Sequence, residues 1–305
     1  MRPHRLLIGF TGLVIALTFA SCQDPTAPAV TPGTPTPTTA TRFRVKTLSQ
    51  DLPNNSAKIS SFTYDAQGRL SAVVAYQSPD SSAAQVERNT YRYDGQNRLI
   101  LHQRQVIAVP GSIFKPFSEQ NQFSYDAAGN VTEIRYSLAN YLLAAPNQTI
   151  VDLAFLNDAT ALAYVVQLRY NAANQLIGST KINYFQGSRG SITSVGEYAY
   201  LSDKLTAFNV VTTSSTFSGS PTRDEGSLTY DTKINPFFGV YVVPTYFGGV
   251  STNFPNLNTL SPNNITTIGG LTFRHEYNAA DLPTVRYTTI GGNAVETLRF
   301  DYEIY

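Results

Sequence analysis

A short recurring phrase constrains the fold of this chain more than any other feature of the sequence. The phrase has an aromatic or apolar residue, one variable residue, Tyr-Asp or Tyr-Asn, a short polar stretch, and Leu or Val. Its tyrosines mostly lie about 30 residues apart, with longer gaps of 45 and 47 residues. Such a period indicates an array of units that fold alike. The copies are FTYDAQGRL (62–70), YRYDGQNRL (91–99), FSYDAAGNV (123–131), LRYNAANQL (168–176), YAYLSDKL (198–205), LTYDTKINP (228–236), HEYNAADLP (275–283) and the fragment FDYEIY (300–305).

Each part of the phrase predicts a piece of a β-hairpin. The tyrosine and the residue two positions before it point to the same face of a strand. The Asp or Asn that follows can bond the backbone two residues on and start a turn. A Gly or Asn late in the loop tolerates positive φ, and Leu or Val then resumes a strand. The residues assigned to this framework are Tyr64, Asp65, Gly68, Tyr93, Asp94, Asn97, Tyr125, Asp126, Gly129, Tyr170, Asn174, Tyr200, Tyr230, Asp231 and Tyr277.

The repeated phrase predicts an all-β fold. About eight hairpins give roughly 14–16 strands, each paired with its neighbour in sequence. We expect an antiparallel hairpin meander that forms one large twisted, rolled sheet, similar to an open barrel. No stretch between phrases keeps a 3.6-residue period, and Gly, Pro and Asn recur too often for long helices. Residues 138–145, LANYLLAA, are the main exception and fit either a short helix or a turn.

The N-terminus predicts export and lipidation. Arg2 and Arg5 precede an apolar run of 15 residues that ends in small side chains, the layout of a secretory signal. This run is shorter than the roughly 20 residues of a membrane-spanning helix. Cys22, the only cysteine, follows in Phe-Ala-Ser-Cys, which resembles the bacterial lipobox. We therefore expect residues 1–21 to be a lipoprotein signal peptide and Cys22 to carry the lipid that anchors the protein; the alternative is a free cysteine in a cleaved signal.

The segment after the cysteine predicts a tether and a location. Residues 22–41 are rich in Pro and Thr and have almost no large apolar side chain, so they cannot offset the entropy cost of ordering. Residues 42–305 then form the β domain. Gln23-Asp24 resembles an export signal of surface lipoproteins, so the expected location is the bacterial outer membrane, on its periplasmic or cell-surface face. From Cys22 onward there are 20 Lys plus Arg and 21 Asp plus Glu, which does not favour nucleic acid as a partner.

The phrase resembles the YD repeat of Rhs-type proteins, Tyr-Asp, two variable residues and Gly-Arg-Leu. Residues 62–70 match it fully, and residues 91–99 match it with Asn97 in place of glycine. This resemblance implies hairpins that form a long, spiralling sheet. The later segments at 235–244, 260–268 and 277–285 are similar to a family of Bacteroidetes lipoproteins.

The aromatic residues give two candidate binding surfaces. The equivalent tyrosines should form a ladder along one sheet face, which indicates cross-strand packing more than a platform for sugar rings or peptides. An insertion at 235–254 breaks the repeat and is crowded with aromatic residues, which can anchor a partner or cap the end of the sheet. The candidate ligand-binding residues are Phe237, Phe238, Tyr241, Tyr246 and Phe247, with Phe254 at the end of the insertion.

The sequence contains no recognisable catalytic motif. His275-Glu276 lacks the second histidine of a zinc-protease helix, and no nucleophile elbow, phosphate loop or calcium loop is present. We predict no catalytic residues, metal or cofactor, and we expect His102 and His275 to be strand-surface residues. The favoured function is a non-enzymatic envelope protein that binds a glycan or a protein. The alternatives are a polysaccharide hydrolase with paired carboxylates and a purely structural role.

An outer-membrane barrel is the competing interpretation of so many strands. The last strand argues against it. Its apolar residues, Leu298, Phe300, Tyr302 and Ile304, share one face, while Arg299, Asp301 and Glu303 share the face of the terminal Tyr305. A charged lipid-facing surface would be costly.

Overall fold

The computed structural model describes most of the predicted β domain. The described residues are 42–78, 86–107, 117–140, 162–184, 191–215, 219–240, 252–254 and 256–305. The predicted leader, Cys22 and the tether lie outside them. Within these ranges, no helix is both long and apolar enough to cross a bilayer.

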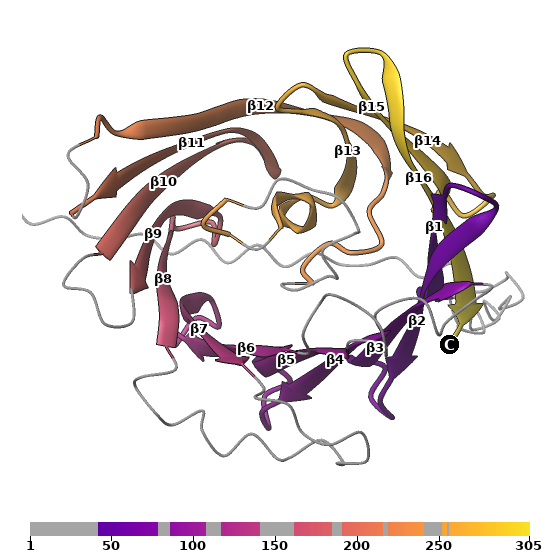
Figure 1. The fold of residues 1–305 in the computed structure, drawn as a ribbon, viewed down its shortest axis with the longest axis horizontal. Coiled ribbons are helices and arrows are strands. Elements are labelled where there is room, and N and C mark those ends of the chain that lie inside the picture. Colours follow the sequence, from indigo (N-terminus) through magenta and orange to yellow (C-terminus); the bar gives the residue numbers. More distant parts are fainter. Residues whose placement is uncertain are drawn as a thin grey trace, which may run out of the picture. The chain divides into compact units, whose positions relative to one another are not determined.

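Sixteen strands of the described residues pair in chain order as one closed antiparallel barrel (Figure 1). This confirms the all-β meander and its strand number. The helical alternative fails for Leu138–Asn140, which continue β7, and the rest of 138–145 lies outside the described residues. The strands are β1 (Phe43–Leu52), β2 (Ser56–Tyr64), β3 (Leu70–Ser78), β4 (Val86–Tyr93), β5 (Leu99–Ile107), β6 (Phe117–Tyr125), β7 (Val131–Asn140), β8 (Leu162–Tyr170), β9 (Leu176–Tyr184), β10 (Ser191–Leu201), β11 (Lys204–Ser214), β12 (Thr222–Ile234), β13 (Asn263–Ile268), β14 (Leu271–Tyr277), β15 (Pro283–Ile290) and β16 (Asn293–Ile304).

Pairing between the first and last strands closes the barrel. The ladder between β1 and β16 runs from Phe43↔Ile304 to Gln50↔Leu298, with one bulge in β1. Ion pairs reinforce the seam, with Arg44 Nε 2.6 Å from Glu303 Oε1. The repeat spacing had left open whether the sheet closes. Closure removes the two free edges that an open sheet would expose.

Near the Tyr-Asp loops the strands turn apolar side chains into the barrel and polar side chains outward. On β16, Leu298 and Phe300 are buried, whereas Arg299 and Asp301, which alternate with them, are exposed. The same alternation on β4 buries Tyr91 and exposes its neighbour Arg92. This confirms the face assignment made for the last strand, whose outward Arg299 and Asp301 differ from the apolar outer face of barrels that face lipid.

The Tyr-Asp loops share one backbone design. In the first, Asp65 Oδ1 accepts hydrogen bonds from the N–H groups of Gln67 (3.0 Å) and Arg69 (2.9 Å). The Gly68 N–H donates to the Asp65 carbonyl, and Gly68 has φ +78°. The same bonds recur around Asp94, whose loop has Asn97 at φ 64°. The predicted turn chemistry is therefore confirmed. Asn171 and Asn278 begin two further loops of this kind.

The repeated tyrosines join neighbouring hairpins. The ladder between β3 and β4 stops at Ala72↔Thr90, and beyond it the Tyr93 hydroxyl donates to the Leu70 carbonyl at 2.8 Å. Tyr125 bonds the Leu99 carbonyl in the same way, at 2.7 Å. Tyr64 and Tyr302 make the equivalent bonds to the carbonyls of Val45 and Pro283. The tyrosine thus satisfies a carbonyl that the strand ladder leaves unpaired.

Two phrases depart from the predicted hairpin. The strands β10 and β11 are joined by only Ser202 and Asp203. Asp231 does not start a hairpin turn, because β12 continues through it to Ile234. Its carboxylate instead accepts from the N–H groups of Lys233 and Asn264 and from the Tyr277 hydroxyl. The long insertion that follows explains the difference, since the chain does not turn directly back into β13.

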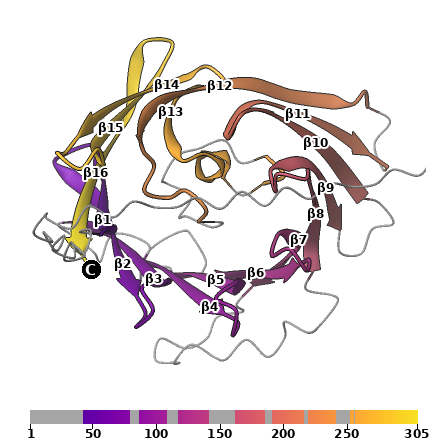
Figure 2. The ribbon, with the colours of Figure 1, turned by 180° about the vertical axis from the view of Figure 1, so that it is seen from behind.

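This insertion enters the barrel. Figures 1 and 2 show the short helix η5 (Leu257–Leu260) inside the ring of strands. Phe237, Phe254 and Leu257 join the buried core, at 3%, 1% and 0% exposure. The Phe237 ring lies 5.8 Å from that of Phe62, and Asn253 donates to the Ser194 carbonyl at 2.7 Å. The described parts of the insertion therefore pack in the barrel interior, and Phe237 and Leu260 lie near the end that carries the Tyr-Asp loops, which we call the turn end.

Gly129 and Gly95 form a matched pair for testing the loop design. A Cβ would meet nothing within 4 Å at either position, but only Gly129 has a positive φ, +88°. We expect Gly129→Ala to lower the free energy of unfolding by about 1–2 kcal/mol, because of left-handed backbone strain. Gly95→Ala should leave it unchanged or slightly raised. Urea denaturation measures both, and equal effects would refute the assignment.

The tyrosine hydroxyl bond makes a second prediction. Tyr93→Phe should cost about 1 kcal/mol of unfolding free energy, because the Leu70 carbonyl loses its donor. Tyr184→Phe is the control, since Tyr184 is 45% exposed on the outer face. A Tyr93→Phe variant as stable as this control would show that the bond does not join the hairpins.

Candidate functional site

A cleft of about 500 Å³ opens at the turn end of the barrel. We call it the first cleft. It lies between the Tyr-Asp loops that follow β2, β4 and β6 and the inner segment Pro236–Val240. Its volume is in the range of small-molecule sites. Each loop connects the two strands of its hairpin at the same end of the barrel, so the three loops lie in a row and form one wall.

Tyrosines and arginines alternate along this wall. The guanidinium carbon of Arg69 lies 4.6 Å from the ring centre of Tyr93, and that of Arg98 lies 4.8 Å from Tyr125. Arg44 lies 4.2 Å from Tyr64 and 4.8 Å from Tyr305. Each loop arginine therefore stacks on the tyrosine of the next repeat. Burial raises the pKa of Tyr93 to about 12, which keeps its hydroxyl protonated as a donor.

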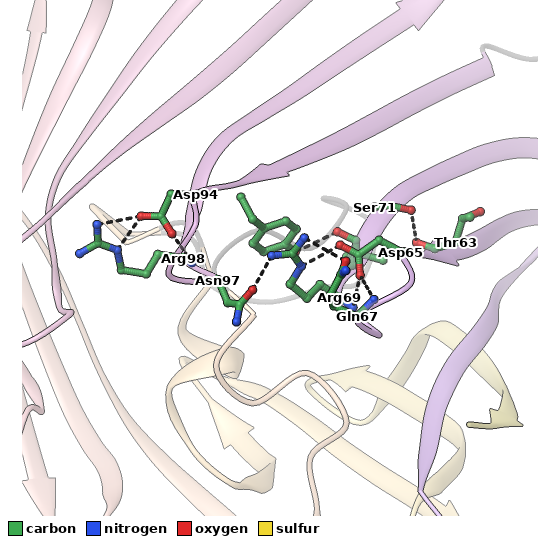
Figure 3. A network of polar contacts seen from close by, with 10 residues as sticks. Thr63, Asp65, Gln67, Arg69, Ser71, Asp94, Asn97 and Arg98 are labelled. Atoms are coloured by element: carbon green, nitrogen blue, oxygen red, sulfur yellow. Dashed lines mark hydrogen bonds and ion pairs between the residues drawn. The ribbon is translucent and has the colours of Figure 1, made fainter.

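The arginines are held by acids of their own loops. Figure 3 shows Arg69 Nε bonded to Asp65 and Arg98 bonded to Asp94, each at 2.7 Å. Arg69 also donates to Asn97 in the next loop, at 2.7 Å. Hydrogen bonds from the backbone and the Arg98 side chain lower the pKa of Asp94 although partial desolvation opposes them, so it stays ionised. These pairs fix the guanidinium groups before any ligand arrives.

A second cleft of about 320 Å³ lies on the other side of the inner segment. It is lined by Tyr170, Tyr200 and Phe238, among others. Asn130 and Gln175 also line it, and they stand in their loops where Arg69 and Arg98 stand in the loops of the first cleft. The two clefts therefore differ mainly in charge.

The candidate ligand-binding residues are divided between these clefts. Phe237 is buried and lines the first cleft, while Phe238 is 55% exposed and lines the second. Tyr241, Tyr246 and Phe247 lie outside the described residues, as does Cys22. Sequence reasoning missed Arg44, Arg69 and Arg98 as site residues. The Gly-Arg-Leu part of the phrase carried the signal for Arg69, but it gave no reason to place that side chain in a cleft.

A polar network lines another part of the inner wall. Arg104 donates to Glu87 and to Glu119, each at 2.9 Å, and the Tyr136 hydroxyl also bonds Glu119. Burial would raise the pKa of Glu87, but the hydrogen bond and charge of Arg104 prevail and lower it. A carboxyl held ionised in this way is poorly suited to act as a general acid. Within the described ranges, no cluster of three or more His, Cys, Asp and Glu could hold a metal ion.

His102 sits at the centre of this network. It is 2% exposed, with Nε2 2.9 Å from Asn89 Oδ1 and Nδ1 3.3 Å from Asn121 Nδ2. These partners fit a neutral ring that donates through Nε2 and accepts at Nδ1. Burial, aided by the charge of Arg104, lowers its pKa to about 3. The prediction that each histidine lies on the strand surface is therefore wrong for His102, because an inward position on β5 buries it.

Comparisons with known proteins give structural neighbours only. No family model matches the chain, and no curated protein matches it. A porin-like protein from Bacteroides uniformis aligns with TM-score 0.47 and 12% identity, over 85% of this chain and 98% of its own. A porin-like protein from Bacteroides vulgatus aligns with TM-score 0.38 and 10% identity, over 86% and 99%. At this level neither neighbour assigns a function to this chain.

The buried histidine predicts a pH dependence of stability. Because the pKa of His102 is about 3 when folded and 6.5 ordinarily, the unfolded chain binds more protons between these values. Stability should therefore fall as the pH drops below about 6.5. His102→Gln, which can keep both hydrogen bonds, should reduce the loss of unfolding free energy between pH 6.5 and 4.5 by about 2 kcal/mol.

Denaturation at a series of pH values measures this effect. His275→Gln should reduce the loss over the same interval by a similar amount, because burial lowers the pKa of His275 to about 4. An unchanged pH dependence in His102→Gln would mean that His102 is not held neutral.

Proposed function

We propose that this chain is a lipid-anchored protein of the bacterial outer membrane whose barrel binds a saccharide without transforming it. The first cleft carries the proposal, because it is concave, rich in tyrosine and of a size suited to a small ligand. A stable protein partner would instead be expected to cover about 800 Å² of surface. No Asp or Glu is among the described residues that line the cleft, which disfavours the alternative of a hydrolase with paired carboxylates there.

The outer surface supports an anchored barrel rather than an embedded one. Arg92, Arg223 and Glu225 lie exposed on the outer faces of β4 and β12, in addition to Arg299 and Asp301 on β16. Arg and Lys side chains on a lipid-facing surface cost about 2–4 kcal/mol each at the bilayer midplane, and acidic side chains cost less. The signal-like leader and Cys22 supply another means of membrane attachment.

The repeat supports a relationship to YD-repeat (Rhs-like) proteins. In the two best-matching phrases, the tyrosine joins hairpins, the aspartate organises the loop, the residue at positive φ completes it, and the leucine returns to the core. We infer that this chain uses the phrase to build a small barrel, closed by the pairing of β1 with β16.

A pair of exposed residues across the closing seam tests the location of the binding site. Phe43 and Ile304 face each other in the ladder, at 37% and 69% exposure, but only Phe43 lines the cleft. A glycan array should identify a saccharide that the 42–305 domain binds. Phe43→Ala should then weaken its binding about fivefold, the loss of about 1 kcal/mol of aromatic contact.

Calorimetric titration of both variants decides the question. Ile304→Ala should bind as the unmodified protein does. A blank array would sink the proposed function, whereas equal binding by both variants would place the site elsewhere.

A further inference from the structure

The first cleft carries a concentration of positive charge. Arg44, Arg69 and Arg98 line it, and no carboxylate is among its described lining residues. Each arginine forms an ion pair with an acid: Arg44 with Glu303, Arg69 with Asp65, and Arg98 with Asp94. The cleft therefore presents guanidinium groups to a ligand although each has a counter-charge nearby.

The loop design does not explain these arginines. Asn130 occupies the position of Arg98 in the next repeat, where its N–H and its side chain bond Asp126 in the same way. Gln175 occupies it in the repeat after that, bonded to Asn171. Neutral side chains thus complete the same loop. Of the three loops that form the wall of the first cleft, those after β2 and β4 carry arginine, and the loop after β6 carries Asn130.

Two of the arginines keep donors for a ligand. Arg98 uses Nε and Nη2 on Asp94, and Arg44 uses Nε on Glu303. In the part of the chain that the structure describes, Nη1 of Arg98 and both Nη groups of Arg44 have no hydrogen bond. Arg69 is fully engaged, with Asp65, Asn97 and Gln67, and contributes charge. Paired guanidinium donors match the planar geometry of a carboxylate.

We propose that the first cleft binds an acidic saccharide, with uronic acid carboxylates held by the guanidinium group of Arg44 and by that of Arg98, which lie on either side of Arg69 along the wall. This rests on the proposed function and names the class of its ligand. The tyrosines between the arginines, Tyr64, Tyr93 and Tyr125, supply the flat apolar surface for the sugar rings. The second cleft has tyrosines, Asp203 and no arginine among its described lining residues, so it should not favour the acid.

The probes are an oligogalacturonate and the same oligosaccharide fully methyl-esterified, in which each carboxylate is replaced by an uncharged methyl ester. Calorimetric titration of the 42–305 domain should show at least tenfold tighter binding of the acid. Raising the ionic strength should weaken the acid's binding and leave the ester's unchanged. Arg98→Asn, which copies the chain's own Asn130, should lose about tenfold in affinity for the acid and nothing for the ester.

Arg92→Asn is the matched control. It removes the same charge from the same strand–loop unit, but Arg92 is exposed on the outer face of β4, and it should bind the acid as the unmodified protein does. Thermal unfolding checks that both variants fold. A sulfated oligosaccharide serves as a third probe. Tighter binding of sulfate than of uronate would overturn the carboxylate assignment.

The outcomes separate the two proposals. Equal binding of acid and ester would overturn the charge selectivity and leave saccharide binding intact. Equal losses of affinity for the acid in Arg98→Asn and Arg92→Asn would also overturn it, because long-range attraction between the protein's positive charge and the acid would then account for the preference. No binding of any saccharide, with capture of an acidic peptide instead, would overturn both proposals.

Discussion

The fold depends on how an antiparallel barrel satisfies its backbone where the ladders between hairpins stop. Inside a hairpin the turn completes the ladder, but between hairpins the last carbonyls at the turn end have no strand partner. The hydroxyls of Tyr64, Tyr93 and Tyr125 donate to these carbonyls from the next hairpin. A buried carbonyl without a donor would cost about as much as a lost hydrogen bond. The recurring tyrosine therefore stabilises the joins between repeats as well as their packing.

The same contacts assemble the cleft. Because each tyrosine must reach the neighbouring hairpin, its ring lies across the join, and the arginine of the preceding loop stacks on it. The aspartate that organises the loop also holds this arginine. Structure and binding surface therefore come from one set of residues. Variation at the arginine position changes the charge of the wall without changing the loop, as Asn130 and Gln175 demonstrate.

The described parts of the insertion, residues 235–240, 252–254 and 256–260, contribute to the packing of the barrel interior. Phe237, Phe254 and Leu257 complete a core that the strands alone would leave unfilled. Deeper on the inner wall the side chains become polar, and Arg104 holds two carboxylates in place. Since a buried charge is costly unless it is paired and hydrogen-bonded, this network has little freedom to rearrange.

The sequence by itself determined the elements of the barrel and the faces of its strands. Alternation around Tyr64 or Phe300, and turn chemistry at Asp65 and Gly68, are local properties that depend only on residues a few positions apart. The sequence could not place Asp231 correctly, because its role depends on Tyr277 and Asn264, which are distant along the chain. Nor did the sequence predict that His102 is buried, because its hydrogen-bond partners come from the two neighbouring strands.

Only the tertiary structure decided closure and the cleft. Closure requires that β1 and β16, about 250 residues apart, meet in register after the twist of sixteen strands has accumulated. The cleft requires in addition that an insertion near residue 237 return to loops at residues 68 and 97. Local patterns carry no information about such distances. They are set by how the whole sheet curves and by what must fill its interior.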